Sequence, residues 1–236
     1  MFKAKHTLPA LNPFLLWMTQ SVFRLRKALL EKKNIIEVKI MAEVKVLIEG
    51  YAKKLEKGWV ASSTTCLVTT EDKKIITDPG CNRERLLEAL QREGLITKDI
   101  DYVFLSHRHP DHVLLAGIFE NAKFITFDTN LMYDKDLLLE FDKHVLGEDV
   151  EIIETPGHVE EHLSLIVNTP KGKIVIAGDV IWWLDGEKQV FNINQKDRSQ
   201  SKGMDMNKLI ESRKRILEIA DYIIPGHGKM FKVKNE

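Results

Sequence analysis

Four side chains that commonly bind metal ions lie within six residues, in the run Ser106-His107-Arg108-His109-Pro110-Asp111-His112. His107 and His109 are two residues apart on an extended segment, so both point to the same side and can reach one metal ion. Asp111 and His112 then turn into a predicted helix and can address a second position. Imidazole and carboxylate ligands suit zinc, and also manganese or iron. This run therefore predicts a metal site at the end of a strand.

Three further segments repeat this context of a strand end followed by a turn: Thr155-Pro156-Gly157-His158, Gly178-Asp179 and Pro225-Gly226-His227-Gly228. In each segment, a glycine beside a His or Asp lets the backbone turn sharply. Each is weak alone, because a His after Pro-Gly is usually only a turn residue. Together the four strand ends supply seven candidate ligands: His107, His109, Asp111, His112, His158, Asp179 and His227. Seven ligands are enough for two adjacent ions that share one carboxylate.

The pattern after Met41 predicts an α/β body. Strands are expected at residues 44–51, 59–69, 74–77, 102–106, 123–127, 151–154, 163–167, 173–177 and 222–224. Helices are expected at 82–93, with Asn82 as the N-cap and Gly94 as the stop, from 112 to 119, and at 208–219. Strands come first as a meander and then alternate with helices, and this order repeats. That order predicts two sheets packed face to face with helices outside.

Residues 1–40 are expected to form a basic extension to a body of residues 41–236. They carry eight Lys and Arg against Glu31 and Glu37, a net charge of +6 in a chain whose total is zero. Apolar residues between 15 and 29 recur every three to four positions, which predicts one helix packed on the body or on a partner chain. A helix on a lipid surface and a translation start at Met41 are the alternatives. No transmembrane segment is expected, since the apolar run 14–18 is far shorter than the roughly 20 residues needed.

Charge and cysteine content limit the partners and the compartment. Lys plus Arg and Asp plus Glu number 35 each, so no global polyanion-binding role follows from composition. The body is mildly acidic, which disfavours tight binding of nucleic acid without excluding it. Two cysteines, Cys66 and Cys81, cannot form a disulfide framework, so a cytoplasmic location is expected. A homodimer is left open.

The ligand pattern resembles that of the metallo-β-lactamase superfamily of hydrolases. The first run matches the superfamily's H-x-H-x-D-H signature, and the remaining ligands follow in the expected order, so the match covers residues 44–233. The resemblance implies an αβ/βα four-layer sandwich with metals at one edge. It implies that His107, His109 and His158 hold the first ion. Asp111, His112 and His227 would hold the second, Asp179 would bridge the two, and Asp78 would support a ligand from behind.

The sequence departs from the patterns of several branches of the superfamily, which disfavours an antibiotic-cleaving role, redox chemistry and membership of the glyoxalase II branch. Class B1 β-lactamases have Arg at the position of His112 and Cys at that of Asp179, and flavo-diiron oxygen reductases have Glu at that of His109. Glyoxalase II enzymes continue into a helical domain after the last His, and a nucleic-acid branch with a large insertion does not fit the 47 residues between Asp179 and His227. The segments 49–52 and 212–215 are similar to one animal branch, which is described as a ribonuclease.

We therefore expect a binuclear metal hydrolase that uses a metal-bound hydroxide on a small ester, thioester or lactone. Bound zinc lowers the pKa of water to about 7, and Asp111 is the expected catalytic residue, orienting the hydroxide and passing its proton to the leaving group. The alternatives are a phosphodiesterase or ribonuclease acting on RNA, and a non-catalytic metal-binding module. The basic residues Lys196, Arg198, Lys202 and Lys208 could attract a phosphate or simply form a solvated face.

Some residues near these motifs have two readings each. His162 is either a support or substrate contact near the metals or a polar residue that starts a strand. Trp182, Trp183 and Leu184 form either an apolar lip of the cleft or part of the core. Cys81, close to Asp78, is expected to be structural.

Overall fold

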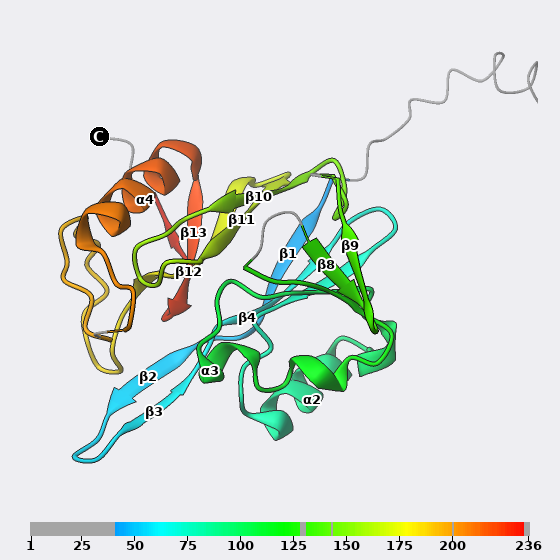
Figure 1. Cartoon of the computed structure of the whole chain (residues 1–236), viewed down its shortest axis with the longest axis horizontal. Coiled ribbons are helices and arrows are strands. Elements are labelled where there is room, and N and C mark those ends of the chain that lie inside the picture. The colour runs from blue at the N-terminus through cyan, green and yellow to red at the C-terminus, as the bar shows by residue number, and fades with distance from the viewer. Residues whose placement is uncertain (1–40, 128–130, 143, 200, 234–236) are drawn as a thin grey trace, which may run out of the picture. The chain divides into compact units, whose positions relative to one another are not determined.

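The computed structural model describes residues 41–127, 131–142, 144–199 and 201–233 (Figure 1). The expected extension, residues 1–40, lies outside the described residues, so its helix and the domain boundary at residue 41 stay predictions. Within the described part, every helix is too short or too polar to cross a membrane.

The larger sheet has seven strands in the order β1-β4-β5-β6-β7-β8-β9. Their bounds are β1 Glu43–Ile48, β4 Thr65–Thr69, β5 Lys74–Thr77, β6 Tyr102–Phe104, β7 Lys123–Ile125, β8 Leu131–Asp134 and β9 Leu137–Glu140. Strand β4 is antiparallel to β1 and β5, whereas β5, β6 and β7 are parallel. The parallel pair β5–β6 needs a crossover, which helix α2 (Arg83–Arg92) provides, and the side chain of Asn82 caps this helix as predicted.

The smaller sheet has five strands in the order β10-β11-β12-β13-β14. Their bounds are β10 Val150–Glu154, β11 Leu163–Thr169, β12 Gly172–Trp182, β13 Tyr222–His227 and β14 Phe231–Lys232. Strands β12 and β13 are parallel and are joined through helix α4 (Met206–Ile219). The carboxyl ends of β12 and β13 therefore reach the same edge of the sheet.

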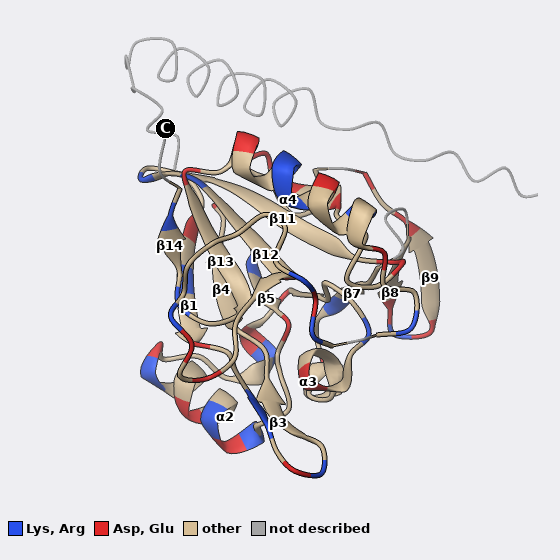
Figure 2. Ribbon diagram, turned by 90° about the vertical axis from the view of Figure 1, so that its left-hand side faces the viewer, with Lys and Arg blue, Asp and Glu red and all other residues tan. Residues whose placement is uncertain are grey.

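Successive side chains of a strand point to opposite faces of its sheet, so each sheet packs on the other sheet with one face and on helices with the other, which gives four layers. Ile75 of β5 faces the smaller sheet and packs in the core between the sheets, while the next residue, Ile76, packs with α2. In the smaller sheet, Ile174 faces the inter-sheet core and Val175 packs with α4. The predicted αβ/βα sandwich is confirmed. Both outer helices carry charges of both signs on the ribbon (Figure 2).

Two predicted strands are divided in the structure. The predicted strand 59–69 is β3 (Trp59–Ser62) followed by β4, because the chain leaves the β2–β3 hairpin at Ser63 to join the larger sheet. The predicted strand 44–51 is divided at Gly50 into β1 and β2 (Tyr51–Lys54). A Cβ at Gly50 would lie 2.3 Å from the carbonyl oxygen of Gly226, so the two backbones meet there.

The helix predicted at 112–119 is shorter and starts earlier. Helix α3 spans Pro110–Val113, with the proline in the first turn where its missing N–H costs nothing, and a separate 3₁₀ turn, η2, covers Ala116–Ile118. A second 3₁₀ turn, η1, spans Thr97–Asp99. Strands β8, β9 and β14 were not predicted.

Candidate metal centre

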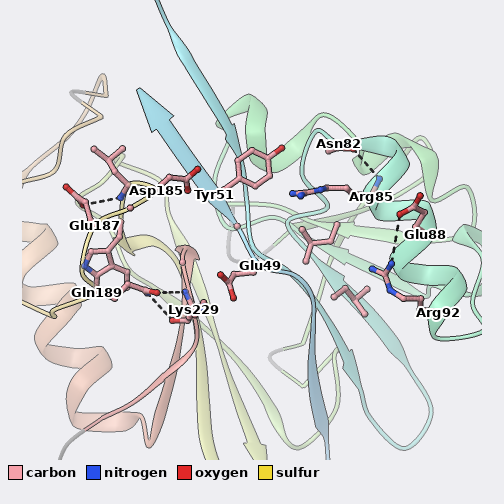
Figure 3. Close-up of a pocket in the computed structure, with 17 residues that line it drawn as sticks. Glu49, Tyr51, Asn82, Arg85, Glu88, Arg92, Asp185, Glu187, Gln189 and Lys229 are labelled. Atoms are coloured by element: carbon pink, nitrogen blue, oxygen red, sulfur yellow. Dashed lines mark hydrogen bonds and ion pairs between the residues drawn. The ribbon is translucent and has the colours of Figure 1, made fainter. Parts of the chain in front are cut away.

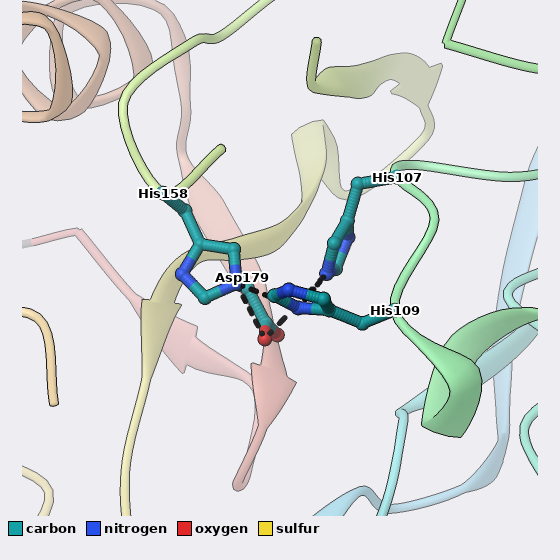
Figure 4. A group of neighbouring side chains, drawn as sticks. All are labelled: His107, His109, His158 and Asp179. Atoms are coloured by element: carbon teal, nitrogen blue, oxygen red, sulfur yellow. Dashed lines mark hydrogen bonds and ion pairs between the residues drawn. The ribbon is translucent and has the colours of Figure 1, made fainter. Parts of the chain in front are cut away.

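The structure brings all seven candidate ligands to one edge of the sandwich. The run that follows β6 supplies four of them, and the others follow β10, lie in β12 or end β13. They form two groups, and within each group the ligand atoms lie within 4.8 Å of one another. The first group is His107, His109, His158 and Asp179, drawn in Figure 4. The second group is Asp111, His112 and His227.

Asp179 lies between the two groups. Its Oδ2 is 3.3 Å from Nε2 of His158 and 3.8 Å from Nε2 of His107. Its Oδ1 is 3.2 Å from Nε2 of His112 and 3.5 Å from Nε2 of His227. The two oxygens of one carboxylate therefore face different groups, which is the geometry of a bridging ligand.

Two glycines allow this close approach. Gly178 has a φ of 53°, a left-handed conformation that favours glycine, and it turns β12 so that Asp179 faces the cluster. Gly226 in β13 lies against Asp179, since a Cβ there would be 2.0 Å from Oδ1 of that residue. The glycines next to the ligands therefore serve the packing of the centre as well as its turns.

Asp78 supports the cluster from behind, as the resemblance implied. Its Oδ1 accepts the backbone N–H of Ser106 at 2.8 Å, and its Oδ2 accepts the Ser106 hydroxyl at 2.7 Å. The same Oδ2 lies 3.0 Å from Nδ1 of His112. Because Nδ1 is engaged there, Nε2 of His112 is the nitrogen that faces Asp179.

His162 is buried behind the cluster and is not placed as a ligand. Its Nε2 accepts the backbone N–H of Asp179 at 3.2 Å, and its Nδ1 lies 2.9 Å from the hydroxyl of Thr155. Burial lowers the pKa of His162 well below its usual value, which agrees with a neutral ring that accepts at Nε2. His162 therefore supports the backbone of Asp179, and it is not among the residues that line the adjacent cavity.

Asp197 is a functional candidate that the sequence reasoning missed. Its Oδ2 lies 2.5 Å from Nδ1 of His158, and both side chains are fully buried. For its neighbours Lys196 and Arg198, the sequence indicates only a possible role of their charge. The local signal was an Asp two residues before Ser199, a pattern typical of a side chain that closes a turn on its own backbone.

The carboxylates and imidazoles of the cluster shift one another's pKa values. Burial raises the pKa of Asp179, but the imidazoles of His112 and His227 outweigh it and hold that pKa well below the usual range. Burial lowers the pKa of His112, but Asp179 and Asp78 outweigh it and raise that pKa well above its usual value. The pKa of His227 is raised to about 9 in the same way, against its burial, chiefly by Asp179. Protons thus occupy positions that a divalent cation can take over, since metal binding displaces ligand protons.

The residues present fit a pair of metal ions. Five imidazoles and two carboxylates are a donor set that zinc and related metals accept. Nε2 of His112 and Oδ1 of Asp179 are buried and lie 3.2 Å apart, but neither has a partner with hydrogen-bond geometry among the described residues. Buried polar atoms without partners are costly, so these two atoms favour a shared cation between them.

A cavity of about 420 Å³ opens onto the cluster at His109, Asp111, Asp179 and His227. Among the described residues, the rest of its wall is mainly apolar, with three polar side chains and neither Lys nor Arg: Ala52, Trp59, Ala61, Cys81, Pro110, Leu114, Trp182, Ser199 and Ser201.

The rings of Trp59 and Trp182 meet edge to face at 6.4 Å in this wall. Trp182 is therefore part of the cleft lip, whereas Trp183 packs on Phe231 in the core. The sequence predicts a structural role for Cys81. It donates to the carbonyl of Ala61 at 3.1 Å and also lines the cavity.

A larger cavity, of about 1120 Å³, lies away from the ligands between β2, α2 and the segment after β12 (Figure 3). None of the seven candidate ligands lines it. Its charged residues have both signs, including Glu49, Arg85, Glu88 and Lys229. This cavity is the larger of the two, but only the smaller one is lined by candidate metal ligands.

Comparison with known proteins identifies the class. Residues 58–126 match the family model described as the metallo-β-lactamase superfamily. Metallo-β-lactamase domain-containing protein 1 of Xenopus laevis is 31% identical over 196 residues, which cover 80% of each chain. The chain therefore belongs to the metallo-β-lactamase superfamily.

Among its relatives, the similarity to the animal branch noted in the sequence is confirmed. Metallo-β-lactamase domain-containing protein 1 of Mus musculus is 32% identical over 203 residues, 81% of this chain and 75% of that protein. A hydroxyacylglutathione hydrolase of Xylella fastidiosa is 31% identical over 133 residues, 53% of this chain and 47% of that protein. The prediction of a metal-dependent hydrolase of this superfamily is confirmed.

Solved structures agree on the fold. A putative metallo-β-lactamase from Thermotoga maritima matches with a TM-score of 0.59 at 23% identity, over 81% of this chain and 99% of that one. AidC, a dizinc quorum-quenching lactonase, matches with a TM-score of 0.53 at 18% identity, over 75% of this chain and 78% of that one.

Proposed function

We propose that this chain is a binuclear metallo-hydrolase that cleaves a small, uncharged ester, thioester or lactone with an apolar acyl group. The observation that carries the proposal is the cavity beside Asp179 and Asp111. Its wall joins the candidate ligands to Trp59 and Trp182 and, in the part of the chain that the structure describes, offers no Lys or Arg to an anionic substrate. A dizinc quorum-quenching lactonase and a hydroxyacylglutathione hydrolase among the similar proteins support this class.

The seven ligands would hold the two ions as the resemblance implied. His107, His109 and His158 would hold the first, Asp111, His112 and His227 the second, and Asp179 would contact both. When bound, the ions would activate water and polarise the substrate carbonyl oxygen. Zinc remains the first expectation, with manganese or iron as alternatives.

Asp111 is the proposed catalytic residue of the chain itself. Its carboxylate lines the cavity and its Oδ2 lies 3.4 Å from Nε2 of His227. The pKa of Asp111 is lowered against its burial, chiefly by the contact with His227, so the group is ionised and can accept a proton. We expect Asp111 to orient water, accept its proton and return that proton to the leaving group.

The RNA alternative is less well supported by the same residues. Arg213, in the basic run shared with the animal branch, is buried and donates to three backbone carbonyls. Arg198 pairs with Glu187 at 2.5 Å. Phosphate binding needs accessible cations, and the described residues that line the cavity beside the ligands include no Lys or Arg.

The test is a substrate panel on protein loaded with zinc. Loading should reach close to two zinc ions per chain, and a plateau at one would contradict the binuclear centre. Loaded protein should hydrolyse an acyl ester, an acyl thioester or an acyl lactone faster than bis(p-nitrophenyl) phosphate. Hydrolysis of the phosphodiester alone would favour the nuclease. Zinc binding without any hydrolysis would favour a non-catalytic metal-binding module.

A pair of hairpin variants tests the apolar wall. Trp59→Ala should lower kcat/KM for a long acyl ester by at least about tenfold relative to an acetyl ester, since even small changes in apolar contact have such effects. Val60→Ala is the matched control, because Val60 is exposed beside Trp59 and does not line the cavity. Equal effects of the two variants would contradict the acyl site. A cytoplasmic location and a homodimer stay predictions.

A further inference from the structure

Both oxygens of the Asp197 carboxylate have hydrogen-bond partners near the candidate metal centre. One oxygen, Oδ2, lies 2.5 Å from Nδ1 of His158. The other, Oδ1, accepts the backbone N–H of Ser199 at 2.8 Å and its hydroxyl at 2.7 Å. An ionised carboxylate only accepts, so Nδ1 of His158 carries the hydrogen. Its Nε2 is then the nitrogen without a hydrogen, and this atom lies 3.3 Å from Oδ2 of Asp179.

The same segment also reaches His109. The Ser201 hydroxyl donates to the Ser199 hydroxyl at 2.7 Å, and its oxygen lies 3.2 Å from Nε2 of His109. The opposite nitrogen of that ring, Nδ1, lies 2.8 Å from Nε2 of His107 and 3.0 Å from Nε2 of His158. Asp197, Ser199 and Ser201 therefore orient two of the three imidazoles in the first group.

Arg213 of α4 anchors this segment from the interior. Its Nε donates to the carbonyl of Val180 at 2.9 Å, and its Nη1 donates to the carbonyls of Ile193 and Gln195 at 3.0 and 2.6 Å. Val180 follows Asp179 directly, and Gln195 lies two residues before Asp197. A rigid guanidinium fork can hold several acceptors at once, which lysine cannot.

The residue beside Arg213 extends the same arrangement. The hydroxyl of Ser212 donates to the carbonyl of Pro156 at 2.7 Å, in the turn that leads to His158. Two adjacent side chains of α4 thus hold the backbone near His158, Asp179 and Asp197. The basic run at 212–215 has an internal role at its first two positions.

We propose that Asp197 is a positioning residue of the first metal site, which fixes His158 in the orientation and tautomer needed for ligation, and that Arg213 positions Asp197 in turn. The inference rests on the proposed metal centre, because the ring it orients is a proposed ligand.

Zinc affinity measured by chelator competition on the full chain tests this inference. Asp197→Ala should lower the affinity for one of the two zinc ions by about 10- to 100-fold, the usual effect of removing a partner of a metal-bound histidine. Asp197→Asn keeps an acceptor without the charge, so its loss should be smaller. Arg213→Lys should lower the affinity for the same zinc ion.

Two variants serve as matched controls. Asp185→Asn removes an exposed carboxylate, and Arg215→Lys changes a neighbouring arginine that makes one 3.3 Å contact with a carbonyl on the surface. Both should keep wild-type zinc affinity and turnover. Equal losses in a control and in its partner variant would overturn the assignment.

The outcomes separate this inference from the proposed function. If the wild-type chain takes up no zinc, the metal centre fails and the role of Asp197 fails with it. If the wild-type chain binds two zinc ions and Asp197→Ala and Asp197→Asn bind them equally well, only the positioning role is overturned. If Asp197→Ala does not fold, the nearly isosteric Asn variant decides.

Discussion

Replacing Gly226 by alanine would test whether the position of the Asp179 carboxylate governs the centre. Gly226 is outside the left-handed region, so alanine costs little in backbone conformation there. Its new Cβ would lie 2.0 Å from Oδ1 of Asp179, 2.8 Å from the carbonyl carbon of Gly178 and 3.0 Å from the backbone nitrogen of Asp179. Cβ contacts below 3.0 Å are essentially absent from real structures, and the nearest atom belongs to a side chain, so we expect the carboxylate of Asp179 to shift by about 1 Å or more.

This displacement removes the oxygen that faces His112 and His227. A misplacement of about 1 Å in a catalytic group can cost about 10²-fold in rate, and we expect at least that loss in Gly226→Ala. We also expect the variant to retain fewer than two zinc ions per chain. The assay measures zinc content after gel filtration and initial rates on the ester that the wild type cleaves best.

Gly117→Ala is the matched control for the added methyl group. A Cβ at Gly117 has no neighbour within 4 Å, so zinc content and rate should equal those of the wild type. Circular dichroism and the urea midpoint should show that both variants are folded. A folded Gly226→Ala variant with two zinc ions and wild-type turnover would refute the reasoning that Asp179 must hold this position.

Five further expectations follow. Asp111→Asn should lower turnover by about 10²-fold, more for a substrate with a poor leaving group than for one with a good leaving group; an equal loss would remove the proton-delivery role. Burial raises the pKa of the Cys66 thiol to about 12, so iodoacetamide at pH 8 should modify only Cys81 in the folded chain and both thiols after unfolding. The same shift means that the unfolded chain loses the Cys66 proton first, so stability should fall as pH rises from 9 towards 12, and Cys66→Ala should reduce that slope. Phe119→Ala, at a fully buried ring, should lower the free energy of unfolding in urea by about 3–5 kcal/mol; a loss below about 1 kcal/mol would contradict the packing. A chain that begins at Met41 should keep its zinc and its turnover per site, and loss of metal there would assign the extension to the fold.

The candidate ligands could be predicted because each carries a local signal. Each one was predicted to follow a strand, and those outside the first run have a glycine beside them, whereas their gathering at one edge was implied only by the resemblance to the superfamily. Asp197 carries no comparable signal. Its partner, His158, is 39 residues away, and only the path of the chain between β12 and α4 brings them together.

The fold was predicted best where burial is continuous. Strand β5 has the predicted bounds, and β11 and β12 contain the predicted segments but extend beyond them. Strands β8 and β9 were missed because they are four-residue strands, the last two of the larger sheet, and leave Tyr133, Leu137 and Leu138 exposed, so they show no clean alternation. The split of residues 59–69 depends on a contact between distant backbones, Thr64 N–H to the Gly226 carbonyl at 2.7 Å, which no local pattern records.

Each of the two ligand groups takes members from both sheets. The run after β6 belongs to the larger sheet, whereas His158, Asp179 and His227 belong to the smaller one. An ion at either group would therefore tie the two halves of the sandwich together, and it could bind tightly only after both had formed. At a free concentration 1,000 times the dissociation constant, one such ion adds about 4 kcal/mol to the free energy of unfolding. The lifetime of the chain in a cell would then follow the local supply of that metal, and starvation for it would remove the protein as well as its activity.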